Sequence, residues 1–185
     1  MIKVIAFDLI GVLIKEKDID LLEDEEKIER LFGPNKSNEE FINLAKEIIG
    51  EDKEVVTITN NIINKLYEIR QDSVFERLKE RYPNIKLVIA TNHVSYVRDF
   101  INKTFNKDLI DDIIISADIG KIKPNIDFYQ YILNSFNILP SELLFLDDNK
   151  NNIDGASNIG INTIKIEKTM DLVDEINKFI IDKKD

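Results

Sequence analysis

The sequence contains no cysteine and only one histidine among its 185 residues. Without cysteine there can be no disulfide framework, no thiolate zinc site and no thiol nucleophile, and a reducing cytoplasmic location is favoured. No apolar run approaches the ~20 residues needed to span a bilayer, and the first residues lack the pattern of a secretion signal. We therefore expect a cytoplasmic protein with no membrane partner.

The chain has fewer basic than acidic residues: 25 lysines and arginines against 35 aspartates and glutamates, which gives a net charge of −10. This charge disfavours nucleic acid as a partner, whereas a small phosphorylated ligand can still bind at a locally positive site. A hydrophobic content of 43% over this length is enough for one sizeable core with a small second lobe. No apolar surface stripe stands out, so a monomer is the default.

Short apolar runs recur along the chain and end at polar residues. Such runs are typical of strands that are buried on both faces of a parallel sheet. From residue 85 onward they alternate with segments of helical periodicity, and Pro124 suits the first position of one such helix. The pattern predicts a Rossmann-like α/β fold. The expected strands span residues 3–7, 85–90, 113–115, 143–146 and 163–166.

Residues 15–82 show a different pattern, of helices without strands. Ser37 with Glu40, and Ser73 with Glu76, each have the spacing of a capping box at a helix start. The pattern predicts a small helical lobe over residues 15–82, inserted into a core made of residues 1–14 and 83–185.

Polar side chains follow four of the expected strands: Asp8, the Thr91-Asn92 pair, Lys123 in a later loop, and the Asp147-Asp148 pair. If the strands are parallel, these residues lie at one edge of the sheet, where ligands bind in such folds. Carboxylates can attack phosphorus or hold a hard cation, and an ammonium can neutralise charge. This inventory suits phosphoryl transfer.

Four segments together resemble the motifs of the haloacid dehalogenase (HAD) superfamily, which includes many magnesium-dependent phosphatases. The order and spacing of the segments match along the whole chain. They are Phe7-Asp8-Leu9-Ile10-Gly11-Val12-Leu13, Ala90-Thr91-Asn92, Gly120-Lys121-Ile122-Lys123-Pro124 and Phe145-Leu146-Asp147-Asp148-Asn149-Lys150-Asn151-Asn152.

The resemblance implies a HAD-like core whose small helical cap closes over the site and selects the substrate. It implies that Asp8 is the nucleophile, that Thr91 binds the transferring phosphoryl group and that Lys123 screens the charge of both. Asn92 becomes a candidate contact to the substrate. The implied reaction is hydrolysis of a small phosphorylated metabolite through an aspartyl-phosphate on Asp8.

The resemblance also implies a Mg²⁺ ion held by Asp8, the backbone carbonyl of Ile10 and Asp148, with support from Asp147 and Asn152. Phosphatases of the superfamily usually carry a second aspartate at the position of Ile10. That missing carboxyl would protonate the leaving alcohol and then activate water. Acid/base help of this kind is worth ~10²–10⁴ in rate, so we expect activity to be weakened or restricted to good leaving groups.

Ile10 leaves two other interpretations open. The site could bind a phosphorylated ligand or a partner protein without useful catalysis, or the chain could be a HAD hydrolase of the dehalogenase or phosphonatase type. A further hypothesis concerns His93, the single histidine, which follows Thr91-Asn92 and could supply the missing proton.

Overall fold

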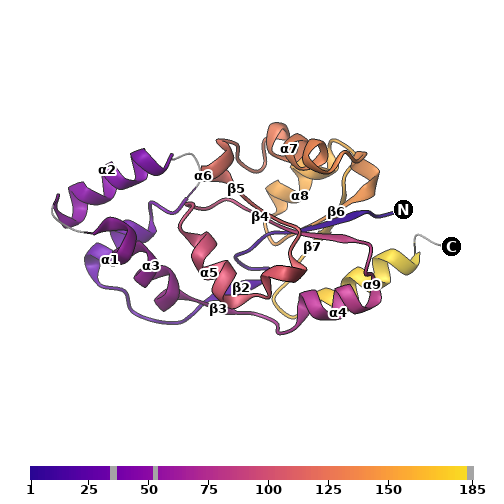
Figure 1. Cartoon of the computed structure of the whole chain (residues 1–185), viewed down its shortest axis with the longest axis horizontal. Helices are drawn as coiled ribbons and strands as arrows, with labels where there is room; N and C mark the ends of the chain where they lie inside the picture. The colour runs from indigo at the N-terminus through magenta and orange to yellow at the C-terminus, as the bar shows by residue number, and fades with distance from the viewer. Residues whose placement is uncertain (34–36, 52–53, 183–185) are drawn as a thin grey trace.

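The computed structural model describes residues 1–33, 37–51 and 54–182. Figure 1 shows a central sheet between two helical layers, with a helical lobe at the end of the molecule opposite the two termini. In chain order the elements are β1 (Val4–Phe7), β2 (Ile14–Glu16), α1 (Glu23–Glu29), α2 (Asn38–Ile49), α3 (Val55–Leu66), β3 (Tyr67–Ile69), α4 (Val74–Arg81), β4 (Lys86–Thr91), α5 (Val97–Thr104), η1 (Lys107–Leu109), β5 (Asp112–Ile115), α6 (Ser116–Ile119), α7 (Ile126–Phe136), η2 (Pro140–Glu142), β6 (Leu143–Asp147), α8 (Lys150–Ser157), β7 (Asn162–Lys165) and α9 (Leu172–Asp182).

The five strands of the main sheet are all parallel, in the order β5-β4-β1-β6-β7. β1 lies at the centre, where Phe7 pairs with Ile89 on one side and with Leu146 on the other. Because the strands are parallel, the residues that follow them meet at one edge of the sheet. The predicted α/β class and all five predicted strands are confirmed.

Each face of the sheet has its own apolar core, and the alternation of side chains along β1 divides its residues between them. Ile5 and Phe7 join the core beneath α4, α5 and α9, and the same core continues into the lobe. Val4 and Ala6 join the core beneath α7 and α8. Both faces of β1 are therefore covered, which fixes the position of the residue after it.

The lobe contains α1, α2 and α3, and it is joined to the core by two chain segments that pair as a short antiparallel ribbon. In this ribbon Ile14 of β2 pairs with Ile69 of β3. The expectation of helices without strands over residues 15–82 was therefore wrong. α4 also falls within that range, but it packs against α9 of the core.

Two local predictions also differ from the structure. Ser73 precedes α4 with a φ of 55° and makes no side-chain cap, because an N-cap residue needs an extended backbone and that of Ser73 is left-handed. Pro124 lies outside α7, after a cis peptide bond with Lys123, and Asn125 is the residue that precedes the helix.

The capping box at α2 is confirmed. The backbone N–H of Ser37 donates to the Glu40 carboxylate at 2.8 Å, and the N–H of Glu40 donates to the Ser37 hydroxyl at 3.2 Å. Across the described ranges, none of the helices has the length and apolar character that crossing a bilayer demands.

Candidate active site

A cavity of about 330 Å³ opens where the central strands end, and all six candidate site residues from the sequence line it. The lining consists of Asp8, Ile10, Thr91, Asn92, Lys123, Pro124, Asp148, Asn149, Asn151 and Asn152. These residues come from four separate segments of the chain. The parallel sheet therefore brings the predicted residues together.

Lys123 joins two carboxylates at the base of this cavity. Its Nζ donates to Oδ1 of Asp8 at 2.6 Å and to Oδ2 of Asp147 at 2.8 Å. Asp8 follows β1 and Asp147 ends the neighbouring strand β6, so the sheet itself sets the two carboxylates side by side. All three side chains are nearly or fully buried, so water screens their charges weakly.

Asp8, Asp147 and Asp148 each offer a carboxylate oxygen, and these oxygens lie within 4.8 Å of one another. Three carboxylates and the ammonium of Lys123 leave a formal charge of −2, which a divalent cation balances. Hard cations such as Mg²⁺ prefer oxygen ligands of this kind. The residues present therefore fit the magnesium ion that the resemblance implies.

The three carboxylates are not equally available to an ion. Asp147 is fully buried and accepts hydrogen bonds from Lys123, from Nδ2 of Asn152 at 3.0 Å and from the N–H of Asn149 at 2.8 Å. Asp148 is exposed at the cavity mouth. This difference favours Asp8 and Asp148 as ligands, with Asp147 as a support.

Burial and like charge disfavour the ionised carboxylates. Burial raises the pKa of Asp8 to about 6, since the attraction of Lys123 only partly offsets it and Asp147 raises it further. Burial and Asp147 also raise the pKa of Asp148. For Lys123, burial lowers the pKa, but Asp8 and Asp147 together outweigh it, so the net pKa is raised and the ammonium is retained.

The loop that carries Lys123 is fixed by two contacts. Nδ2 of Asn92 donates to the carbonyl of Lys123 at 2.9 Å, and its Oδ1 accepts from the N–H of the same residue at 2.9 Å. On the other side, a Cβ at Gly155 of α8 would lie 2.6 Å from the carbonyl oxygen of Pro124. Asn92, expected to contact substrate, thus also positions the lysine.

Gly11 lies directly against the acidic cluster, with a φ of +83°. The backbone conformation favours glycine, and a Cβ at this position would lie 2.6 Å from Cγ of Asp148 and would displace that carboxylate. Ile10, immediately before it, is half-buried and packs against the larger core. No carboxyl group therefore stands at the position of the second aspartate.

His93 does not take the place of the missing carboxyl, and the hypothesis that it does was wrong. Its ring is 1% exposed, lies 5.1 Å from the ring of Phe32, and its Nε2 is 3.2 Å from the hydroxyl of Tyr67. Burial lowers the pKa of His93 to about 4. The ring is a neutral part of the interface between lobe and core, outside the lining of the cavity.

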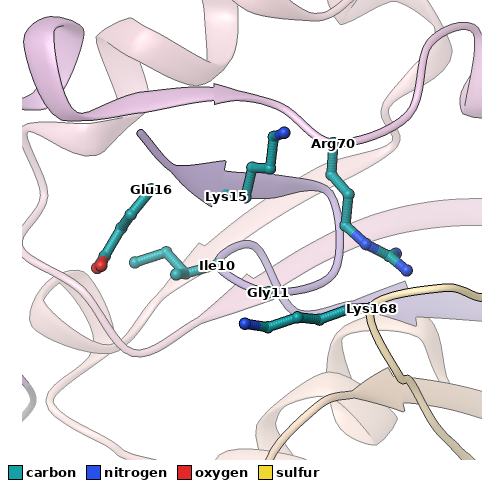
Figure 2. A pocket seen from close by; sticks show the side chains of 6 residues that line it. All are labelled: Ile10, Gly11, Lys15, Glu16, Arg70 and Lys168. Atoms are coloured by element: carbon teal, nitrogen blue, oxygen red, sulfur yellow. The ribbon is translucent and has the colours of Figure 1, made fainter. Parts of the chain in front are cut away.

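A second cavity, of about 610 Å³, lies beside the first and shares Ile10 with it. Figure 2 shows its lining residues, which are Ile10, Gly11, Lys15, Glu16, Arg70 and Lys168. The sequence analysis did not identify the four charged residues among them. Lys15 and Glu16 belong to β2, Arg70 directly follows β3, and Lys168 lies in the loop after β7, and no motif or spacing marks them as neighbours.

The sequence profile of a family described as haloacid dehalogenase-like hydrolase matches residues 5–166. Among solved structures, a predicted HAD-like family hydrolase from Porphyromonas gingivalis is similar, with a TM-score of 0.76, 23% identity and coverage of 97% of this chain and 98% of that one. A HAD family enzyme from Bacteroides thetaiotaomicron, in complex with magnesium and inorganic phosphate, has a TM-score of 0.76 and 21% identity over 95% of this chain and 99% of that one. At such identities these likenesses show the fold alone.

Curated relatives match shorter segments. D-ribitol-5-phosphate phosphatase from Bacteroides thetaiotaomicron is 29% identical over 69 residues, which are 37% of this chain and 34% of that protein. Other relatives are much longer proteins, of which the matched segments make up 12% or 13%.

Proposed function

Because the chain belongs to the haloacid dehalogenase-like hydrolase family, we propose that it is a magnesium-dependent phosphatase that hydrolyses a small phosphorylated metabolite. One observation carries this proposal: Lys123 joins Asp8 to Asp147 in a cavity that Asp148 also lines. A phosphatase relative and a fold neighbour in complex with magnesium and phosphate support it. We also propose a cytoplasmic location, because the sequence contains no cysteine.

In the proposed reaction, an oxygen of the Asp8 carboxylate attacks phosphorus while the bond from phosphorus to the leaving oxygen breaks. The leaving group departs as its anion and takes a proton from solvent, because Ile10 has none to give. Lys123 holds the carboxylate in place, and its ammonium, together with the hydroxyl of Thr91, binds oxygens of the transferring group. The oxygen of a water molecule then attacks phosphorus, the bond from phosphorus to the Asp8 oxygen breaks, and the proton of the water passes to solvent, which releases phosphate and restores Asp8. Asp8, Asp148 and the carbonyl of Ile10 would hold Mg²⁺, whose charge stabilises the phosphoryl oxygens.

Ile10 sets the limit on this activity. It has no proton to give to the departing alcohol and no base to activate water, so esters with good leaving groups are the expected substrates. The same residue favours a second candidate function, in which the site binds a phosphorylated ligand with little turnover. Phosphoryl transfer depends mainly on positioning and charge, which is why we favour the enzyme.

Phosphate release from a panel of monoesters, with Mg²⁺ and with a chelator, tests the proposal. We expect release from aryl esters that requires Mg²⁺ and is abolished in Asp8→Asn, while the exposed control Asp127→Asn keeps wild-type activity. Binding of phosphate esters with no release in any condition would support the ligand-binding function instead. Release that persists in the chelator would contradict the magnesium-dependent mechanism.

A further inference from the structure

The second cavity is locally positive in a strongly acidic chain. Lys15, Arg70 and Lys168 line it against a single carboxylate, that of Glu16, so the lining carries a formal charge of +2, whereas the whole chain carries −10. In Figure 2 the Glu16 carboxylate and the Arg70 guanidinium lie at opposite sides of the cavity.

Arg70 is held rigidly but without neutralisation by a paired carboxylate. Its guanidinium donates to the carbonyls of Val12 at 3.0 Å, Glu167 at 2.7 Å and Met170 at 3.0 Å. A guanidinium has five N–H donors, so two remain. Burial lowers the pKa of the Arg70 guanidinium, and the nearby carboxylates of Asp148 and Asp171 offset that effect only in part.

Lys168 is a free cation of this cavity. In the part of the chain that the structure describes, its ammonium makes no hydrogen bond or ion pair, and Figure 2 shows its side chain extending past Gly11 toward Ile10. Lys15 differs, because its ammonium pairs with Glu68 at 3.1 Å on an exposed surface. Lys168 is thus the cation most available to a ligand.

The two cavities adjoin in a way that one small molecule can use. Ile10 lines both, and Gly11 of the second cavity lies against Asp148 of the first. A phosphoryl group bound at Asp8 would therefore direct the rest of its molecule past Ile10 and toward Lys168.

We propose that the cavity lined by Lys15, Arg70 and Lys168 binds a second anionic group of the substrate, a carboxylate or a second phosphate. The substrate class is then a compact phosphate monoester with an anion at its far end. This inference rests on the proposed function, because it takes the Asp8 cavity as the phosphoryl site. Lys168 provides the free charge, and Arg70 provides a fixed guanidinium with donors to spare.

Binding of two non-hydrolysable probes tests the proposal without turnover. We would titrate phenylphosphonate and 4-carboxyphenylphosphonate into the full chain with Mg²⁺ by calorimetry and compare the ratio of their affinities. The wild type should favour the carboxylated probe about tenfold, a magnitude typical of one charge-assisted contact. Lys168→Met should reduce that preference to about twofold, and Lys168→Arg should restore most of it.

Lys107→Met, which removes an exposed lysine of η1, is the matched control and should keep the wild-type ratio. Equal affinities in the wild type, or a preference that survives Lys168→Met, overturn the proposal, as does the absence of binding by either probe. The two proposals fail separately. Turnover of phenyl phosphate without a carboxylate preference removes only the anion site, whereas a Lys168-dependent preference without turnover removes only the phosphatase.

Discussion

The cavity around Asp8 and the cavity around Lys168 meet at Ile10, yet they hold their charges in different ways. In the first, Lys123 is buried and bonded to Asp8 and Asp147, so these three charges have fixed partners. In the second, Lys168 is exposed and has no partner among the described residues. Buried pairs keep their geometry, whereas exposed cations adapt to what binds them.

The difference assigns separate roles to the two cavities, with the proposed chemistry at Asp8 and the proposed substrate selectivity at Lys168. The Asp8 cavity is built from residues that follow strands of one sheet, and the two cores on either side of β1 fix it. The Lys168 cavity is built from a short ribbon and a loop. Substitutions of its exposed lysines, such as Lys168, can therefore change the second cavity without disturbing the first.

Replacing the residue that the cavities share should have the largest effect. Ile10→Asp supplies the carboxyl group that the first cavity lacks, and we expect kcat for alkyl phosphate esters to rise by ~10²–10⁴. The gain should be smaller for nitrophenyl esters, whose leaving group needs little protonation. Ile10→Asn is the control, because it is polar but transfers no proton, and equal gains in the two variants would contradict an acid/base role. Steady-state phosphate release measures both.

Gly11 lines the second cavity and lies against Asp148 of the first, so replacing it should affect both cavities. Gly11→Ala combines a left-handed backbone with a close approach to the Asp148 carboxylate, whose exposed side chain must move, so we expect a loss of about 2 kcal/mol in unfolding free energy. Gly120→Ala is the matched control: its φ of +63° is also positive, but no atom lies within 4 Å of the added Cβ. It should lose about 1 kcal/mol. Urea unfolding compares them, and equal losses would show that the collision is relieved.

Replacing His93, next to the first cavity, tests how much this buried ring contributes to the pH dependence of stability. Its pKa of about 4 in the folded protein lies below the ordinary value of 6.5, so the unfolded chain binds the proton more tightly. The stability associated with neutral His93 is fully present above pH 6.5 and is lost as the pH falls toward 4.

Between pH 7 and pH 5 this loss should amount to about 2 kcal/mol. His93→Gln should remove that part of the pH dependence, which urea unfolding at the two pH values measures. An identical pH dependence in the variant would mean that the ring is already solvated in the folded protein.

The sequence was sufficient to predict the first cavity. Asp8, Thr91 and Asp147 lie where apolar runs end, and parallel strands necessarily bring such residues to one edge. It was insufficient for the second cavity, because Arg70 and Lys168 lie about a hundred positions apart and meet only through hydrogen bonds from Arg70 to backbone carbonyls. Every residue has a backbone carbonyl, so the residue types do not reveal which carbonyls Arg70 will contact.

His93 and Ser73 are residues for which the sequence predicted a role that the structure does not show. Each sits at a spacing that favours a role, His93 after a strand end and Ser73 before a helix. The packing of the lobe turned the ring of His93 toward Tyr67, and the left-handed backbone at Ser73 removed its cap. Tertiary contacts decided both outcomes, and no local pattern encodes them.

Ionic strength offers the last and smallest test of the contrast between paired and free charges. Raising the salt from about 0.05 to 0.5 M shortens the screening length to about 4 Å, which weakens exposed interactions more than buried ones. We expect the preference for 4-carboxyphenylphosphonate over phenylphosphonate to fall about threefold, because Lys168 is exposed. Calorimetry at the two salt concentrations measures it. A preference that does not change with salt would mean that the carboxylate is desolvated against Arg70 rather than held by a solvated lysine.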